Sequence, residues 1–260
     1  MPDGKALQMG TSHFLGQNFS KPFDVKYLDE NNTETFAWQT SWGVSWRLIG
    51  GMIMTHGDDK GLVLPPKVAP IQVVIIPIYY SDDEKGNVIQ KANQIKDSLS
   101  KISLRVHLDD REQLTPGFKF NDWEMKGIPI RIEIGPKDVA KNQVVLVRRH
   151  TQTKTSIEMD SSSEKISLEL QNIQKEMFDA AKKILDERIV KVSEYQQFKE
   201  QIDNDKMIDC SWCGNQTCED KIKEETGADI RVIPSGNTKA ETCIYCKNSG
   251  TTNVLFARGY

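Results

Sequence analysis

The segment Ile71–Tyr80, IQVVIIPIYY, decides the fold class of this chain. It is almost continuously apolar, which is typical of a strand that is buried on both faces of its sheet. The next segment, Gly86–Lys101, carries apolar residues at spacings of four, three and four, the period of a helix with one buried face. Leu104–Leu108 is again strand-like. A strand, a helix and a strand in this order predict an α/β domain.

The same domain continues with further elements. Phe118–Lys126 is predicted as a helix, because proline and glycine precede it and Gly127 follows it. Ile128–Ile134 alternates apolar and charged residues, the period of a half-covered strand, and Gln143–Arg149 is the next strand. The resulting β-α-β-α-β-β order indicates a mixed sheet. We place this domain at residues 70–152, after a run of prolines that marks a boundary.

The flanking segments are predicted from shorter patterns. Before the domain, Thr35–Ser41 reads as a strand and Leu48–His56 as a short apolar helix. After it, Ser163–Ile189 has an apolar stripe along one face and is predicted as the longest helix. A second helix is expected at Ser193–Asn204, and a tail that contains all the cysteines follows it.

The composition is that of an ordinary soluble globular protein, with 38% apolar and 27% charged residues among 260. The longest apolar run, Val73–Ile78, is far shorter than the roughly 18–20 residues that span a bilayer. The first residues lack the apolar core of a signal peptide, so we expect a cytoplasmic protein without membrane attachment. The formal net charge of −3 does not by itself indicate nucleic-acid binding, although a basic face can lie on an acidic body.

The cysteines form two closely spaced pairs. Four residues separate Cys213 from Cys218, and two separate Cys243 from Cys246. Two such pairs are the sequence form of a tetrahedral zinc site with four thiolate ligands, which leaves no open position and is therefore structural. The alternative is a set of buried free thiols. Cys210 is the fifth cysteine, and Cys210 with Cys213 is an alternative ligand pair.

Two polar groups of residues are candidates for binding. The first is the loop Gln8–His13, followed by Ser41–Gly43 and by Arg47 at a helix start, which could bind a small polar ligand with a phosphate. The second is a charged rim on the α/β domain, around Asp109–Arg111 and Arg131. Taken from the residues alone, an ordinary solvated surface remains the alternative for both groups.

Three long stretches of the sequence resemble successive signatures of prolyl-tRNA synthetases. They are GKALQMGTSHFLGQNF (4–19), WQTSWGVSWRLIGGMIMTHGDDKGLVLPP (38–66) and LDDREQLTPGFKFNDWEMKGIPIRIEIGPKD (108–138). They are similar to the eukaryote- and archaeon-like branch, which ends in a tyrosine as this chain does at Tyr260. The resemblance runs across essentially the whole chain. Class II motifs 1 and 2, which lie upstream in that family, are not found in it.

The resemblance implies an α/β fold in three pieces. Residues 1–69 are expected to be the end of the class II catalytic domain, an α+β remnant with an antiparallel sheet. Residues 70–152 are expected to be an anticodon-binding α/β domain with a mixed sheet. Residues 153–260 are expected to be a helical connector and a small zinc-binding α/β tail, whose tryptophan-cysteine pattern matches Cys213 and Cys218 as ligands.

The resemblance also implies site residues. The expected contacts are Gln8, Thr11, Ser45 and Arg47 for ATP, His13 for proline, Arg111, Lys119, Glu124 and Arg131 for the anticodon or its flanking phosphates, and Cys213, Cys218, Cys243 and Cys246 for zinc. Trp46 departs from the family, which usually has a small hydroxyl residue there, and this puts normal ATP geometry in doubt.

The function implied is ATP-dependent attachment of proline to tRNA(Pro), with magnesium accompanying ATP. Because the upstream motifs would supply the other wall of the site, we expect this chain alone to be incomplete for catalysis, and we assign no catalytic residue to it. The complete enzyme is expected to be a homodimer. The competing hypothesis is a non-catalytic tRNA-binding or regulatory module derived from the synthetase.

Overall fold

The structure is a computed structural model that describes residues 1–235 and 241–260. Its internal contacts divide the chain into two compact units. Unit 1 combines residues 1–51 with 188–260, and unit 2 consists of residues 52–187. The fold class expected from the sequence, α/β with antiparallel and mixed sheets, is confirmed. The domain boundaries after residues 69 and 152 stay a prediction.

Unit 2 is built on a five-stranded mixed sheet with the order β6-β5-β7-β8-β9. The strand β5 runs parallel to its neighbours β6 and β7, whereas β8 is antiparallel to both of its neighbours. All residues of β5 are buried, as its continuous apolar sequence predicts. The strands are β5 (Val73–Pro77), β6 (Val106–Leu108), β7 (Ile130–Ile134), β8 (Gln143–Arg148) and β9 (Lys154–Glu158).

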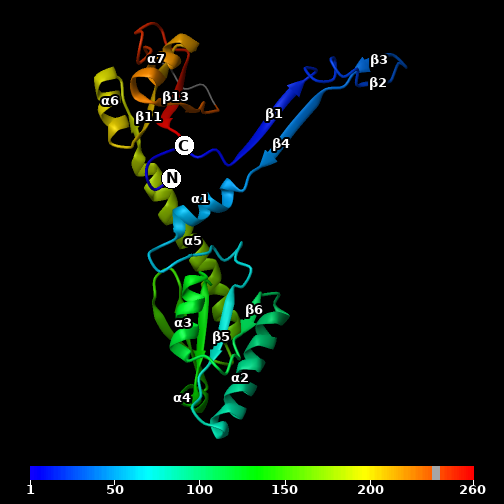
Figure 1. Ribbon diagram of the computed structural model, residues 1–260, viewed down its shortest axis with the longest axis vertical. Coiled ribbons are helices and arrows are strands. Elements are labelled where there is room, and N and C mark those ends of the chain that lie inside the picture. Colours follow the sequence, from blue (N-terminus) through cyan, green and yellow to red (C-terminus); the bar gives the residue numbers. More distant parts are fainter. Residues whose placement is uncertain (236–240) are drawn as a thin grey trace. The chain divides into compact units, whose positions relative to one another are not determined.

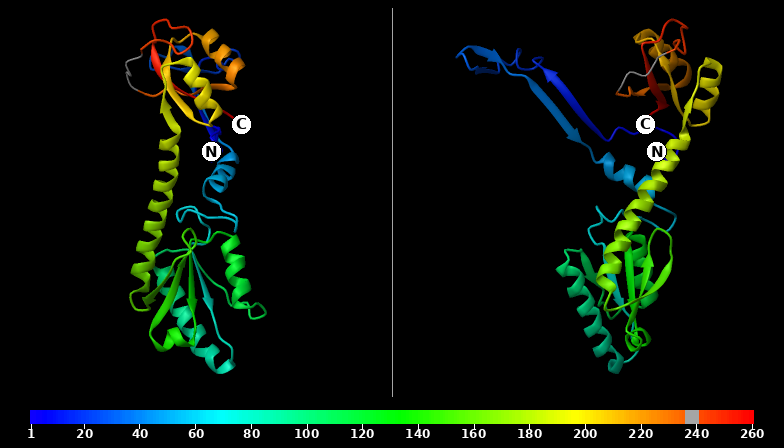
Figure 2. Two further views of the ribbon diagram at one scale, coloured as in Figure 1. Left: turned by 90° about the vertical axis from the view of Figure 1, so that its left-hand side faces the viewer. Right: turned by 180° about the vertical axis from the view of Figure 1, so that it is seen from behind.

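Helices cover both faces of this sheet (Figures 1 and 2). Apolar residues of α2 and α5 share one core cluster with β5 and β7, and Trp123 of α3 packs on the opposite side of β5. Thr115 caps α3 by accepting a hydrogen bond from the backbone of Phe118, with Pro116 in the first turn. The helices are α2 (Asp82–Lys101), α3 (Pro116–Met125), α4 (Pro136–Ala140) and α5 (Ser162–Arg188).

The C-terminal part of unit 1 is a second α/β arrangement. Its sheet has the order β10-β11-β13-β12, in which β10 and β11 are parallel and the remaining pairs antiparallel. Phe198 and Phe256 meet edge to face in its core. Its elements are β10 (Ile189–Lys191), α6 (Tyr195–Asp203), β11 (Met207–Trp212), α7 (Gln216–Thr226), β12 (Ala228–Val232) and β13 (Thr252–Arg258).

The N-terminal part of unit 1 is a long antiparallel ribbon that leads into α1 (Arg47–His56). The predicted strand Thr35–Ser41 is wrong as one element, because the chain breaks between two strands at Ala37 and Trp38. Trp38 turns to stack on Phe14, with ring centroids 5.7 Å apart. The strands are β1 (Gly10–Gly16), β2 (Lys26–Leu28), β3 (Glu34–Phe36) and β4 (Gln39–Val44).

The structure differs from the sequence predictions in one helix start and in further elements. The helix α2 begins at Asp82 and not at Gly86, because acidic residues suit the first turn of a helix. The short helix α4 and the edge strand β9 were not predicted. Among the described residues there is no helix with the length and apolar content that crossing a membrane requires.

Candidate functional site

The residues expected at the nucleotide lie at one end of the β1–β4 ribbon in unit 1. Gln8 Nε2 donates to Thr11 Oγ1 at 3.1 Å, and Ser45 Oγ donates to the Met9 carbonyl, also at 3.1 Å. Arg47 Nη1 lies 3.5 Å from the Gln8 carbonyl, a long hydrogen bond. Local backbone and side-chain contacts therefore bring together the four residues that the resemblance assigned to ATP.

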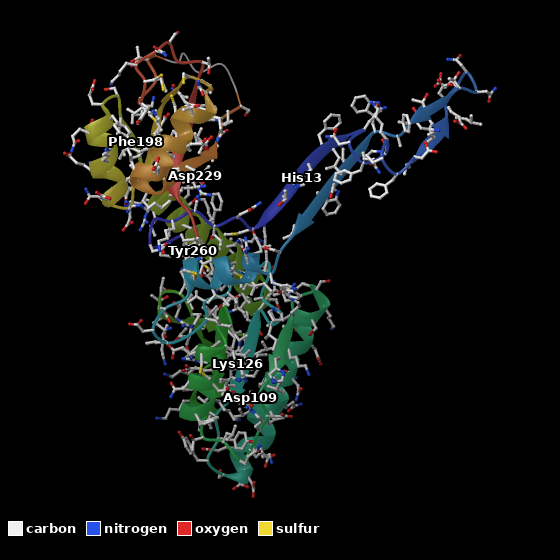
Figure 3. All side chains as sticks on the ribbon, turned by 45° about the horizontal axis from the view of Figure 1, so that its top comes forward. His13, Asp109, Lys126, Phe198, Asp229 and Tyr260 are labelled. Atoms are coloured by element: carbon white, nitrogen blue, oxygen red, sulfur yellow. The ribbon has the colours of Figure 1, made fainter. Side chains whose placement is uncertain are left out.

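The strand register places His13 on the same face of the ribbon as Thr11. Thr11 pairs with Gly43 and His13 with Ser41, so both polar side chains have small partners beside them. His13 and Arg47 are exposed, and His13 stands on β1 in Figure 3. This face therefore offers one open polar wall that is lined by a hydroxyl and an imidazole.

Trp46 is the residue that departs from the family, and it is 86% exposed. Its carbonyl accepts the backbone N–H of Ile49 in the first turn of α1. The described residues form no ring stack or cation–π contact with its indole. The side chain is therefore free to occupy space beside Arg47.

In unit 2, the charged rim is organised around the fully buried carboxylate of Asp109 (Figure 3). Trp123 Nε1 donates to it at 2.7 Å, and Arg111 donates through Nε and Nη2 at 2.8 and 2.7 Å. Arg111 also pairs with Asp122 at 2.9 Å. Burial alone would raise the pKa of Asp109, but the hydrogen bonds from Arg111 and Trp123 outweigh burial and hold it well below its usual range.

Lys119 belongs to the same buried group. It is only 4% exposed, and its Nζ donates to the Asp109 carbonyl at 3.1 Å. Burial also lowers the pKa of its ammonium group. Lys119 thus stabilises the main chain at Asp109. The contact with the anticodon or its flanking phosphates that the resemblance implies for Lys119 stays a prediction.

Glu124 and Arg131 are brought together at a separate small hollow between α3, β7 and the end of β8. The hollow is lined by Trp123, Glu124, Ile128, Arg131, Arg149 and Gln152, among others. Arg149 and Gln152 were missed as site residues. The available signal was a charged residue at the end of the predicted strand Gln143–Arg149, but chain order alone does not show which face such a residue occupies.

Arg131 is held in one orientation at the hollow. Its Nε and Nη2 donate to Glu133 Oε1 at 3.0 and 2.9 Å, and its guanidinium lies 4.5 Å from the centroid of the Phe120 ring. A planar cation that stacks on an aromatic ring loses little freedom on binding a ligand. Arg131 is therefore a pre-organised donor.

The four cysteines predicted as ligands meet in unit 1. The sulfur atoms of Cys213, Cys218, Cys243 and Cys246 all lie within 4.8 Å of one another, and Cys210 is not among them. Cys213 Sγ lies 3.6 Å from Cys218 Sγ and 3.8 Å from Cys246 Sγ. A tetrahedral zinc with Zn–S bonds of about 2.3 Å requires sulfurs about 3.8 Å apart. The donor set therefore fits a closed zinc site.

Three segments of the chain place the four thiols. Cys213 follows β11, Cys218 lies in the first turn of α7, and the other two cysteines flank a turn in which the backbone of Lys247 donates to the Cys243 carbonyl. Burial would raise the pKa of the Cys243 thiol, but backbone hydrogen bonds outweigh it and lower that pKa to about 7. A thiol that ionises near neutral pH is a good metal ligand.

Comparisons with known proteins show what this chain is similar to. Residues 72–169 match the family described as anticodon binding domain, and residues 195–260 match prolyl-tRNA synthetase, C-terminal. A proline–tRNA ligase of Cenarchaeum symbiosum is 55% identical over 260 residues, which is 100% of this chain and 54% of that protein. The chloroplastic/mitochondrial proline–tRNA ligase of Arabidopsis thaliana is 47% identical over 267 residues, 100% of this chain and 49% of that protein.

A solved structure of a prolyl-tRNA synthetase is also similar to this chain. The crystal structure of prolyl-tRNA synthetase from Cryptosporidium parvum, complexed with L-proline and AMP, matches with a TM-score of 0.91 and 40% identity. The match covers 99% of this chain and 56% of that one. The chain spans about half the length of the curated relatives it matches.

Proposed function

We propose, because this chain belongs to the prolyl-tRNA synthetase family, that it forms part of an enzyme which attaches proline to tRNA(Pro) at the cost of ATP. The observation that carries this proposal is the polar wall, by which we mean Thr11 and His13 on the ribbon together with Arg47 at the start of α1. A module that only bound RNA would not need these residues. The complete enzyme is proposed to be cytoplasmic and homodimeric.

The polar wall is proposed to bind ATP and proline. Gln8, Thr11 and Ser45 would contact the nucleotide, and Arg47 would neutralise its phosphates, with magnesium accompanying ATP. His13 would lie beside proline. In the reaction, a carboxylate oxygen of proline bonds to the α-phosphorus of ATP and pyrophosphate leaves. The role of these residues is to position and neutralise the reactants, and we assign no catalytic residue to the chain.

Unit 2 is proposed to read the anticodon of tRNA(Pro) at the hollow that contains Glu124 and Arg131. A carboxylate suits the N–H groups of a guanine, and an arginine suits its acceptors, once an unpaired base is turned outward. Arg111 and Lys119 are proposed to contribute to anticodon recognition indirectly, because both donate hydrogen bonds to Asp109 and so fix the charged rim. This assignment rests on the matched anticodon-binding family and on the two side chains that share one hollow.

The thiol cluster is proposed to hold one structural zinc ion. When bound, the ion would cross-link the end of β11, the start of α7 and the turn that carries Cys243 and Cys246. All four positions of a tetrahedral ion would be filled, which leaves none for a substrate.

The competing function, a non-catalytic tRNA-binding module, is favoured by one observation. His13 lies exposed on the two-stranded β1–β4 ribbon, and Arg47 lies exposed at the start of α1. By itself, such a ribbon cannot exclude water from a reacting adenylate.

A fusion experiment separates the two functions. The 260-residue chain alone should give no proline-dependent pyrophosphate exchange. The amino-terminal half of the Cenarchaeum symbiosum relative, fused in place before this chain, should restore exchange, and His13→Ala should abolish it. A folded fusion that binds tRNA(Pro) without exchange would favour the non-catalytic function, and exchange by the chain alone would contradict our proposal.

A further inference from the structure

Arg149 and Asp58 form a close ion pair inside unit 2, although 91 positions separate them. Two guanidinium nitrogens of Arg149 donate to the two carboxylate oxygens of Asp58 at 2.7 and 2.6 Å. The third nitrogen, Nε, donates to the Glu124 carbonyl at 2.8 Å. Arg149 is only 4% exposed. Its donors are therefore used internally, which makes it unsuitable as a direct reader of a base.

Asp58 in turn fixes a tight loop that carries Lys60. Asp58 and Gly61 exchange two backbone hydrogen bonds of 3.1 Å, and Asp58 Oδ1 accepts the N–H of Lys60 at 2.9 Å. Gly61 has a φ of +129°, and a β-carbon there would meet the Met125 carbonyl at 2.5 Å. The loop therefore lies directly against the end of α3, where only glycine fits.

The loop places the ammonium group of Lys60 beside Glu124. Lys60 Nζ pairs with Glu124 Oε1 at 3.1 Å. That oxygen is buried, and it accepts no well-formed hydrogen bond from any group in the described part of the chain. Glu124 is thus held from two sides, by Arg149 through its carbonyl and by Lys60 through its carboxylate, and its Oε1 has hydrogen-bonding capacity that the described residues do not use.

We infer that Asp58 and Arg149 are positioning residues for anticodon recognition, which hold the Glu124 carboxylate in the orientation that reads a guanine, with Lys60 as its counter-ion. This inference rests on the proposed reading function of the hollow. The physical reason is that a base-reading group discriminates only when its own orientation is fixed by a supporting layer. The Asp58 hydrogen bond to Arg149 lowers the pKa of the carboxyl to about 2, so the pair is ionised at neutral pH.

The test uses the full 260-residue chain and a synthetic RNA hairpin with the anticodon UGG. A matching set replaces each guanine with inosine, which removes only the exocyclic amino group. Fluorescence anisotropy gives the ratio of Kd values for inosine and guanine RNA. The parent should prefer guanine by roughly tenfold, the size of one good base contact. Glu124→Gln should remove most of this preference.

Asp58→Asn and Arg149→Lys should reduce the same ratio to within about threefold, with little change in affinity for the inosine RNA, because a lost orientation affects only the guanine contact. Combining Arg149→Lys with Glu124→Gln should add nothing further to the loss of preference. Asp179→Asn is the matched control. It removes an exposed carboxylate that pairs only with Lys175 on α5, and it should leave the ratio unchanged.

The outcomes separate the inference from the function on which it rests. If Glu124→Gln keeps the full guanine preference, the reading function of the hollow is wrong. If Glu124→Gln loses the preference while Asp58→Asn and Arg149→Lys keep it, the reading function stands and the positioning role is overturned. Equal weakening of both RNAs would also overturn it, since general damage to the fold would cause that. Asp58→Asn, at the more exposed member of the pair, keeps the test informative if Arg149→Lys misfolds.

Discussion

Among single residues, Arg111 and Arg131 show how hydrogen-bond partners distinguish two similar candidates. Arg111 pairs with two carboxylates, those of Asp109 and Asp122, whereas Arg131 pairs with Glu133 beside the hollow. The sequence shows only that both are arginines on a charged rim. Which of them faces a ligand depends on contacts with α3, and such contacts are invisible in the linear sequence.

This difference predicts different effects of two alanine substitutions on hairpin binding. Arg131→Ala should lower discrimination against hairpins with altered anticodon guanines by about 1–3 kcal/mol. Arg111→Ala should lower the free energy of unfolding by about 3 kcal/mol, because it leaves the buried Asp109 carboxylate with one charged partner fewer. Urea denaturation and hairpin binding measure the two effects. Equal loss of discrimination in the two variants would contradict the assignment.

Trp46 carries a second prediction for a single residue. Its indole is exposed next to Arg47, where the family keeps a small hydroxyl residue. In the fusion enzyme, Trp46→Thr should therefore lower KM for ATP severalfold, because the smaller side chain leaves more room for the phosphates. Steady-state pyrophosphate exchange at varied ATP measures this. Unchanged KM and unchanged turnover would mean that the indole points away from the nucleotide.

For whole elements, prediction succeeded where burial produces a period in the sequence. The strand β5 has parallel neighbours on both sides and helices on both faces, so its continuous apolar run was sufficient. The edge strand β9 has only Ile157 buried, and this gives no alternating pattern. The break between β3 and β4 depends on the stacking of Trp38 on Phe14, a contact across the ribbon that local sequence does not show.

For the candidate sites too, local patterns were predictable and contacts between distant residues were not. Short spacing made the cysteine pairs predictable, and the resemblance supplied Glu124 and Arg131. The Asp58–Arg149 pair was not predictable, because it joins a loop before β5 to the end of β8. Contacts between distant positions arise from the topology of the sheet, and neither periodicity nor motif spacing encodes them.

Across the whole molecule, unit 1 is assembled from the two ends of the chain. The Tyr260 hydroxyl donates to Asp3 at 2.6 Å, and Ala6 forms a parallel bridge with Gly259. The segment that leads into the Gln8 loop therefore adjoins the end of β13, in the same unit as the thiol cluster. Loss of order in the cysteine-bearing part should consequently affect the support of the polar wall.

The thiol cluster gives the last prediction, at the scale of the molecule. Metal analysis should find one zinc per chain, and a chelator should loosen residues 207–260 before it affects unit 2, because a closed four-thiolate site contributes its binding energy only to the folded chain. Hydrogen exchange measures the loosening of the two parts separately.

Cysteine variants test the ligand set. Cys213→Ser should lose the metal. Cys210→Ser should keep it, because the Cys210 sulfur is not among the four cysteine sulfurs that lie within 4.8 Å of one another. If Cys210→Ser removes zinc while Cys218→Ser retains it, the ligand set is wrong although a metal site exists.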